Sequence, residues 1–232
     1  MRTFLLLATA ASIILAGPAS AANRNFGVSG FTKVRVDGPF IVRLTTGVAP
    51  FARATGTSNG LDQVAIDVRG DTLVVHRDIN ASSDFSGHDA QPVEISLGTH
   101  ELSAAWLNGS GTLAIDGVKG LSFDLSVQGS GVATLASASI DQLNVSAVGS
   151  ANARLAGKAA RLTAIARGIS SIDASALSVK DATLGVDGSG TLAATVSNSA
   201  KVDASGPATV RLAGKPACTL HVNGAAMVSG CR

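Results

Sequence analysis

A glycine turn recurs at intervals of about 20 residues, or slightly fewer, through the C-terminal part of this 232-residue chain. No other feature restricts its fold as strongly. In most copies of the turn, the glycine is followed by Ser or Ile and then by a small residue. Repeats of this length are typical of solenoids, in which each repeat forms one coil that packs only on its neighbours. The seven turn glycines are Gly109, Gly129, Gly149, Gly168, Gly188, Gly206 and Gly224.

Apolar residues alternate with other residues on both sides of these turn glycines. The positions two and four residues before the glycine, and four residues after it, are apolar in every repeat. A period of two is the pattern of a strand with one buried face, so each repeat predicts two strands that flank the turn. A slip of one residue would expose the whole apolar set, which fixes the register. We therefore expect an all-β fold, a parallel β-solenoid of about seven coils stacked about 4.8 Å apart.

The N-terminal third of the mature chain lacks this spacing. Short strands are predicted at 31–36, 40–44, 51–55, 64–68 and 73–76, with a turn at 57–60 and an exposed polar loop at 78–91. We expect residues 26–92 to form shorter, irregular β coils of larger cross-section. These would lead into the regular repeats of residues 93–232 and cap their open end.

Residues 1–22 have the pattern of a signal peptide. Arg2 precedes an apolar segment at 4–16, Gly17-Pro18 interrupts it, and Ala19-Ser20-Ala21 forms an A-x-A cleavage signal. We expect cleavage after Ala21 or Ala22 and export of a mature chain, residues 23–232, to the periplasm or the cell surface. A retained membrane anchor is the alternative. No later apolar segment approaches 18 residues, so no transmembrane segment is expected in the mature chain.

Cys218 and Cys231 are the two cysteines of the chain. An even count in an exported protein favours a disulfide, and its place in the last repeat suggests that it staples the final coil. Two free thiols are the alternative. The pair lacks the C-x-x-C spacing of most zinc sites, although His221 lies nearby.

Charge and motif content point away from several functional classes. The formal net charge is only +2 and no basic run occurs, so nucleic acid is not an expected partner. The histidines show no zinc-binding spacing, no G-x-S-x-G elbow is present, and the Gly-Ser-Gly turns lack the Lys-Ser/Thr of a phosphate loop. The adjacent pair His88-Asp89 is expected at a loop tip. We predict no catalytic residue, no metal and no cofactor.

The position just before each turn glycine forms a mostly polar column that would run along one edge of the rod. A solvated edge is the simpler interpretation, and a binding ridge is the functional one. Trp106 occupies an outward position of the first regular coil. We favour packing beneath the N-terminal coils over an exposed contact point for this side chain. The candidate binding residues are Asn108, Gln128, Arg167, Asp187, Asn223 and Trp106.

Several stretches together resemble the bacterial family known as the auto-transporter adhesin, head GIN domain. They are residues 31–38, residues 69–75, residues 93–97 and the Gly-Ser-Gly repeats that start at Asn108. The resemblance covers nearly all of the mature chain. It implies an exported protein with a β-solenoid body, and it brings no set of functional residues to transfer.

These observations favour a non-enzymatic protein of the cell envelope or surface, with a binding, adhesin-like or structural role. The expected partner is an envelope or surface glycan or protein, and the oligomeric state is open. The alternative is a β-helical carbohydrate-active enzyme, a polysaccharide lyase or hydrolase, which rests on fold analogy. Such an enzyme needs clustered carboxylates, or a Lys or Arg base together with calcium. The acids of the repeats instead fall in different columns, at Asp124, Asp173, Asp187 and Asp203.

Overall fold

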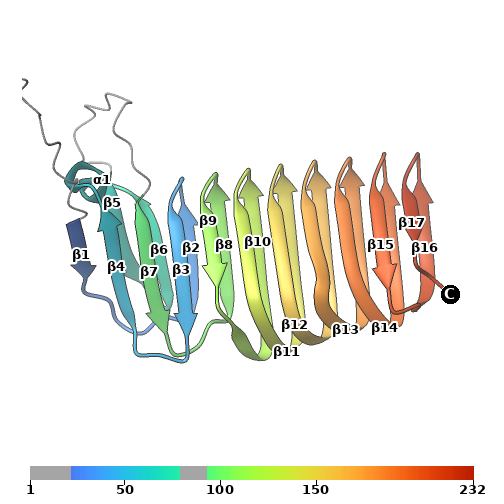
Figure 1. Cartoon of the computed structure of the whole chain (residues 1–232), viewed down its shortest axis with the longest axis horizontal. Coiled ribbons are helices and arrows are strands. Elements are labelled where there is room, and N and C mark those ends of the chain that lie inside the picture. The colour runs from blue at the N-terminus through green and yellow to red at the C-terminus, as the bar shows by residue number, and fades with distance from the viewer. Residues whose placement is uncertain (1–21, 79–92) are drawn as a thin grey trace, which may run out of the picture.

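The computed structural model describes residues 22–78 and 93–232. The predicted leader up to residue 21 and the polar loop with His88-Asp89 lie outside this part of the chain. The protein is nearly all-β, with 74% strand and 3% helix, and its parallel coils form a β-solenoid of about 6 turns. The predicted fold class is confirmed (Figure 1). The sequence suggested about seven coils, but the last repeat ends soon after its turn and does not complete one.

The regular coils are flattened, with a narrow turn at one edge and a wider bend at the other (Figure 1). Two strands per coil were predicted, but the central strands run unbroken from one turn to the next and bend once, so each contributes to both faces. We call the face before the turn glycines the pre-turn face and the opposite one the post-turn face. The strands are β8 (Ala104–Gly109), β9 (Thr112–Ile115), β10 (Val118–Gly129), β11 (Val132–Gly149), β12 (Asn152–Gly168), β13 (Ser171–Gly188), β14 (Thr191–Ser205), β15 (Thr209–Ala213), β16 (Ala217–Asn223) and β17 (Met227–Ser229).

The register of the stack follows the predicted columns. Val127 of β10 pairs with Leu107 of β8 on one side and with Ala147 of β11 on the other, and all three are buried. Equivalent positions stay aligned through the later coils. The apolar columns therefore make one continuous core along the rod, which no single coil could bury alone.

Two features of the backbone at these turns allow only glycine at the turn positions. Gly129, Gly149 and Gly188 have positive φ angles of 103°, 95° and 109°. A Cβ atom on any of them would lie 2.6 to 2.7 Å from the carbonyl oxygen of the turn glycine in the preceding coil. That same carbonyl accepts a hydrogen bond from the residue after the turn, such as Ser130 N–H to Gly109 O at 3.0 Å. Only glycine permits both the backbone conformation and this close approach.

The N-terminal strands do not stack in chain order. β2 (Lys33–Asp37) pairs in parallel with β6 (Thr72–Arg77) on one side and with β8 on the other. β3 (Ile41–Thr46) likewise lies between β7 (Glu94–Thr99) and β9. The first coil of the chain is thus inserted between two later ones (Figure 1). The sequence analysis predicted irregular coils in this region without specifying their order, and the structure shows that β2 and β3 find their neighbours far along the chain.

Antiparallel strands and a short helix cover the N-terminal end. β1 (Ala22–Phe26) and β7 both pair antiparallel with β4 (Phe51–Gly56), and β5 (Val64–Arg69) pairs antiparallel with β6. The predicted turn at 57–60 is instead the start of α1 (Ser58–Asp62), where the Thr57 hydroxyl accepts a hydrogen bond from the Gly60 N–H at 3.2 Å. Arg24 of β1 forms an ion pair with Asp62. The exposed residues of β1 are polar, whereas Phe51 of β4 is 42% exposed.

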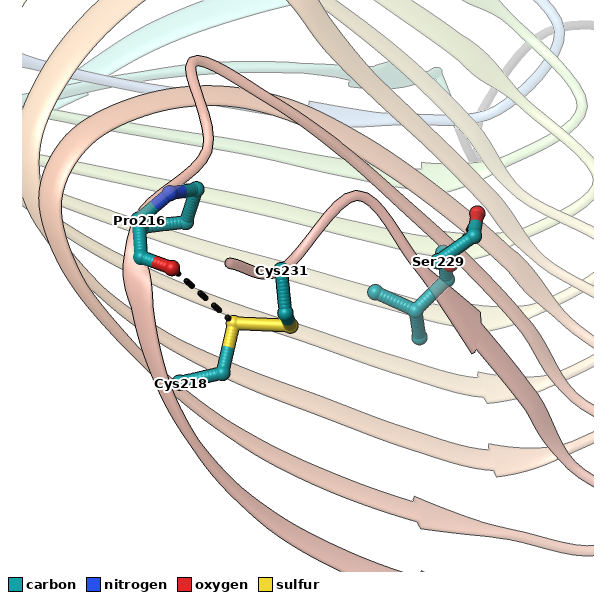
Figure 2. Close-up of a disulfide and its surroundings, with 5 residues drawn as sticks. Pro216, Cys218, Ser229 and Cys231 are labelled. Carbon is teal, nitrogen blue, oxygen red and sulfur yellow. Dashed lines mark hydrogen bonds between the residues drawn. A yellow bond between two sulfur atoms is a disulfide. The ribbon is translucent and has the colours of Figure 1, made fainter.

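A disulfide closes the last coil at the opposite end. Cys218 in β16 is bonded to Cys231, with their Cα atoms 5.8 Å apart (Figure 2). The Arg232 N–H donates to the Pro216 carbonyl at 3.2 Å, so the chain end returns to the start of β16. In the complete coils a bend connects the two faces, and in the last repeat the disulfide makes this connection instead. The predicted pairing of these two cysteines is confirmed.

Candidate binding face

The residues just before the turn glycines form one column along the edge of the pre-turn face. In successive strands Asn108 pairs with Gln128, Arg167 with Asp187, and Ser205 with both Asp187 and Asn223. Asp37 of β2 extends this column by one coil, opposite Asn108. Ser205 Oγ donates to Asp187 Oδ1 at 2.8 Å, so neighbouring members of the column are linked. The structure thus aligns the predicted ridge residues in space.

A shallow groove lies at the N-terminal end of this face, and we call it the Trp106 groove. Its volume is about 780 Å³. It combines three of the predicted residues, Trp106, Asn108 and Gln128, with side chains from the inserted coil. Besides the backbone at Gly109 and Gly129, its walls are formed by Arg35, Asp37, Thr72, Trp106, Asn108 and Gln128.

Trp106 is partly exposed and belongs to the outward column that also holds Arg35 and Ser126. The N-terminal coils therefore flank the indole ring on one side, and the ring lines the groove on the other. Trp106 therefore lies beside the N-terminal coils and is also partly exposed, so each of the two positions considered from the sequence applies in part. An aromatic face beside a guanidinium and planar amides provides both apolar contact and hydrogen-bonding groups to a ligand.

Hydrogen bonds hold the polar wall of the Trp106 groove in place. Arg35 Nε lies 3.0 Å from Asp37 Oδ1 and 2.9 Å from Asp37 Oδ2. Asn108 Nδ2 donates to Asp37 Oδ1 at 2.7 Å. The Asp37 carboxylate therefore orients two donor side chains. The Arg35 side chain is 53% exposed and has further N–H groups that can contact a ligand.

Two further depressions continue the groove obliquely across the pre-turn face. The first lies beside Ser126, the neighbour of Trp106 in the next coil, and also involves Asn144 and Thr163. The second shares Thr163 and reaches the last coils at Lys201 and Thr219. The three depressions form a track from the turn edge at the N-terminal end to the bend edge at the C-terminal end. We call it the pre-turn track.

The far end of the pre-turn track carries both signs of charge. Arg161 and Lys201 line it together with Asp181. Hydrogen bonds from the Ser199 hydroxyl, at 2.6 Å, and from the Asn198 amide, at 2.7 Å, lower the pKa of the Asp181 carboxyl below its ordinary value. Asp181 is therefore ionised at neutral pH, and its Oδ1 accepts hydrogen bonds from both neighbours. Arg161 and Lys201 remain as exposed donors for a ligand.

The track includes only part of the predicted ridge. Arg167, Asp187 and Asn223 lie farther along the same column and outside the three depressions. Arg35 and Asp37, in contrast, were missed by the sequence analysis. Asp37-Gly38 aligns with Asn108-Gly109, so the sequence signal was an additional turn glycine, Gly38, well before the regular series begins.

Groups that could support other chemistry are sparse in residues 22–78 and 93–232. No cluster of three or more His, Cys, Asp or Glu side chains there could hold a metal ion. His76 Nε2 lies 2.9 Å from Asp67 Oδ2, and this hydrogen bond raises the pKa of His76 and lowers that of Asp67. The pair joins β5 to β6 in the N-terminal cap. Within the same residues, no helix has the length and apolar character needed to cross a bilayer.

The fold defines a class of protein, a β-solenoid of stacked parallel coils with a capped N-terminal end. The sequence matches the model of the family described as "Putative auto-transporter adhesin, head GIN domain" over residues 30–216. The chain therefore belongs to this family. Family membership implies a surface or exported protein with a surface binding role. No curated protein matches the chain in sequence.

Solved structures share the same architecture. A putative adhesin from Bacteroides fragilis has 18% sequence identity and a TM-score of 0.75, covering 90% of this chain and 96% of that chain. A protein from Parabacteroides distasonis titled a putative lipid binding protein has 17% identity and a TM-score of 0.71, covering 91% and 97%. A putative adhesin from Parabacteroides merdae has 16% identity and a TM-score of 0.69, covering 91% and 96%. At these identities the likeness establishes the fold alone.

Proposed function

We propose that this protein is an exported, non-enzymatic protein of the cell envelope or surface that binds a linear glycan along the pre-turn track. The Trp106 groove is the observation that carries this proposal. A sugar ring presents an apolar C–H face to an aromatic side chain and hydroxyl groups to planar donors and acceptors around it. Trp106, Arg35, Asn108 and Gln128 supply that combination on one rigid sheet face.

The length of the pre-turn track favours a polymer over a single sugar. Each depression is shallow and open, so one sugar would bury little surface in any of them. Contacts repeated along one chain add up through effective concentration, because the second contact forms within the same complex. The central depression of the track is lined by small hydroxyl side chains, such as Ser126, Ser146 and Thr163, together with larger ones that include Asn144 and Ile165.

The carboxylate content of the groove supports a binding role over hydrolysis. Asp37 is the one carboxylate among the described residues that line the Trp106 groove, and it is engaged by Arg35 and Asn108. Most glycoside hydrolases use two carboxyl groups that flank the scissile bond. The signal peptide predicted at residues 1–22 is the proposed route of export.

Intrinsic fluorescence provides a direct test, because Trp106 is the only tryptophan and the chain has no tyrosine. Titration of the mature protein with soluble neutral and acidic polysaccharides should give a saturable change in emission for at least one of them. The corresponding short oligosaccharides should bind more weakly. Absence of any saturable change across the panel would contradict the proposal.

Variants locate the binding to this face. Trp106→Ala and Arg35→Ala should each weaken retardation in polysaccharide-containing native gels by at least about tenfold, as expected for central contact residues. Arg154→Ala is the matched control, because it removes an exposed arginine from the post-turn half of β12. Equal retardation of all three variants would place binding elsewhere. Release of reducing ends or unsaturated sugars from a polysaccharide would favour the enzymatic alternative.

A further inference from the structure

The two ends of the rod differ in how completely other elements cover the apolar core. The N-terminal end is covered by β1, β4, β5 and α1, and the exposed residues of β1 are polar. The C-terminal end stops at β16 and β17. Among the described residues, β16 pairs only with β14 and β17 only with β15. Each therefore leaves one edge with N–H and C=O groups that no other strand of the chain satisfies.

The apolar columns continue to this C-terminal end and become exposed there. Leu220 and Val222 occupy inward columns in register with the buried Val202 and Ala204 of β14, yet they are 43% and 42% exposed. Met227 of β17 lies in an outward column, in register with Thr209, and is 67% exposed. Natural edge strands are usually protected by charges, proline or bulges. β16 (ACTLHVN) and β17 (MVS) contain no Lys, Arg, Asp, Glu or Pro.

We propose that this end is a docking surface for a second copy of the same chain, and that two rods join end to end about a two-fold axis. β16 would pair antiparallel with β16 of the other copy, centred on Leu220. This surface meets the pre-turn track at Thr219, which lines the last depression. The inference nevertheless rests on the open edges of β16 and β17 and uses no property of the proposed glycan ligand.

The sequence of the edge is self-complementary in this register. With Leu220 opposite its own copy, Cys218 lies opposite Val222 and Thr219 lies opposite His221. Directly opposed residues of an antiparallel pair point to the same side, so inward residues meet inward residues and the core continues across the interface. The pairing places no two like charges opposite each other in β16.

The second edge strand, β17, can also pair with its own copy about the same two-fold axis. The strands on either side of the Gly224 turn run in opposite directions across the core, so Val228, four residues after the turn, faces Leu220, four residues before it. An axis through Leu220 therefore passes near Val228 at the centre of β17. β17 then also pairs with its own copy, and Met227 lies opposite Ser229. One two-fold axis satisfies both open edges, as an isologous interface requires.

Sedimentation equilibrium on the mature chain tests this proposal. The wild type should show a reversible dimer, and Leu220→Lys should weaken it at least about a hundredfold, because two lysines would then be buried face to face. Ile169→Lys is the matched control, since Ile169 is 72% exposed in the middle of the rod. It should leave the dimer unchanged. A wild type that stays monomeric at high concentration would overturn the proposal and leave the edge for a strand of another protein.

A second pair of variants tests the register without depending on Leu220. In β14, Lys201 is the neighbour of Thr219 and Asp203 is the neighbour of His221. Thr219→Glu with His221→Lys therefore suits the fold and also sets opposite charges across the interface. Thr219→Glu with His221→Glu sets like charges there. The first double variant should dimerise about tenfold more tightly than the second, and equal affinities would overturn the proposed register.

Discussion

Gly188 illustrates how single residues determine the coil geometry. Its φ of 109° and the approach of the Gly168 carbonyl both exclude a side chain. Gly188→Ala should therefore lower the free energy of unfolding by about 1–3 kcal/mol. Chemical denaturation of the mature protein measures this change.

Gly185 is the matched control in the same strand, β13. An added Cβ there would meet only Ile165, at 3.8 Å, and no unusual backbone angle is involved. Gly185→Ala should change stability by no more than about 0.5 kcal/mol. A similar loss for both variants would show that strand packing, and not the turn, imposes the requirement for glycine.

Ser170 shows how the repeat accommodates a departure from its own pattern. The equivalent positions two residues after the turn are glycine or alanine in the other regular coils, for example Gly131 and Gly190. Ser170 is buried, and its hydroxyl lies 3.0 Å from the carbonyl oxygens of both Ala147 and Arg167. A buried hydroxyl is tolerated here because it is hydrogen-bonded.

Residue patterns grouped part of the candidate binding face and omitted part of it. Trp106, Asn108 and Gln128 could be grouped because alignment on the turn glycines fixes their columns. Arg35 and Asp37 could not be placed beside them, because pairing between strands so far apart in the chain leaves no local pattern. Residues 33–44 nevertheless fit the repeat, with Val34 and Val36 before Gly38 and with Val42 and Leu44 after it.

At the level of elements, the last coil has the weakest core of the regular stack. The side chains of the inward column six residues before the turn become smaller along the rod. In order they are Phe123, Leu143, Leu162, Ala182, Ala200 and Cys218. Smaller side chains bury less apolar surface and stabilise their coil less. The disulfide in this coil offsets that loss.

Cys218→Ser should lower the melting temperature under oxidising conditions. The two cysteines are separated by 13 residues, and closing a loop of this size is worth about 3 kcal/mol in the chain-entropy model. Cys231→Ser should give the same decrease, and a reducing agent should bring the wild type to the same value. If only one of the two variants loses stability, the effect belongs to that side chain and not to the bridge.

The order of the N-terminal elements could not be predicted from the sequence. The alternation in β2, β3, β6 and β7 identifies them as strands with one buried face, and all five strands predicted before the polar loop overlap observed ones to within two residues at each end. Alternation does not specify which strand lies beside which. Short strands with similar apolar columns are compatible with several neighbours, and only the complete stack selects one arrangement.

For the whole molecule, location decides which glycans can reach the pre-turn track. Protease treatment of intact cells, followed by immunoblotting, should digest the protein if the rod lies on the outer surface, as we expect for a surface binding protein. Lysed cells and a periplasmic marker are the controls. Protection of the protein until lysis would contradict surface exposure and direct the search to ligands within the envelope.

The insertion of β2 and β3 between later coils also affects how the rod can be built. These strands gain both of their neighbours only after residues 94–115 are available, so the N-terminal layers cannot be added one by one as the chain lengthens. The C-terminal coils, by contrast, each pack on the coil just before them. Growth or loss of whole repeats during evolution is therefore open to the C-terminal half, while the N-terminal half must be inherited as a unit.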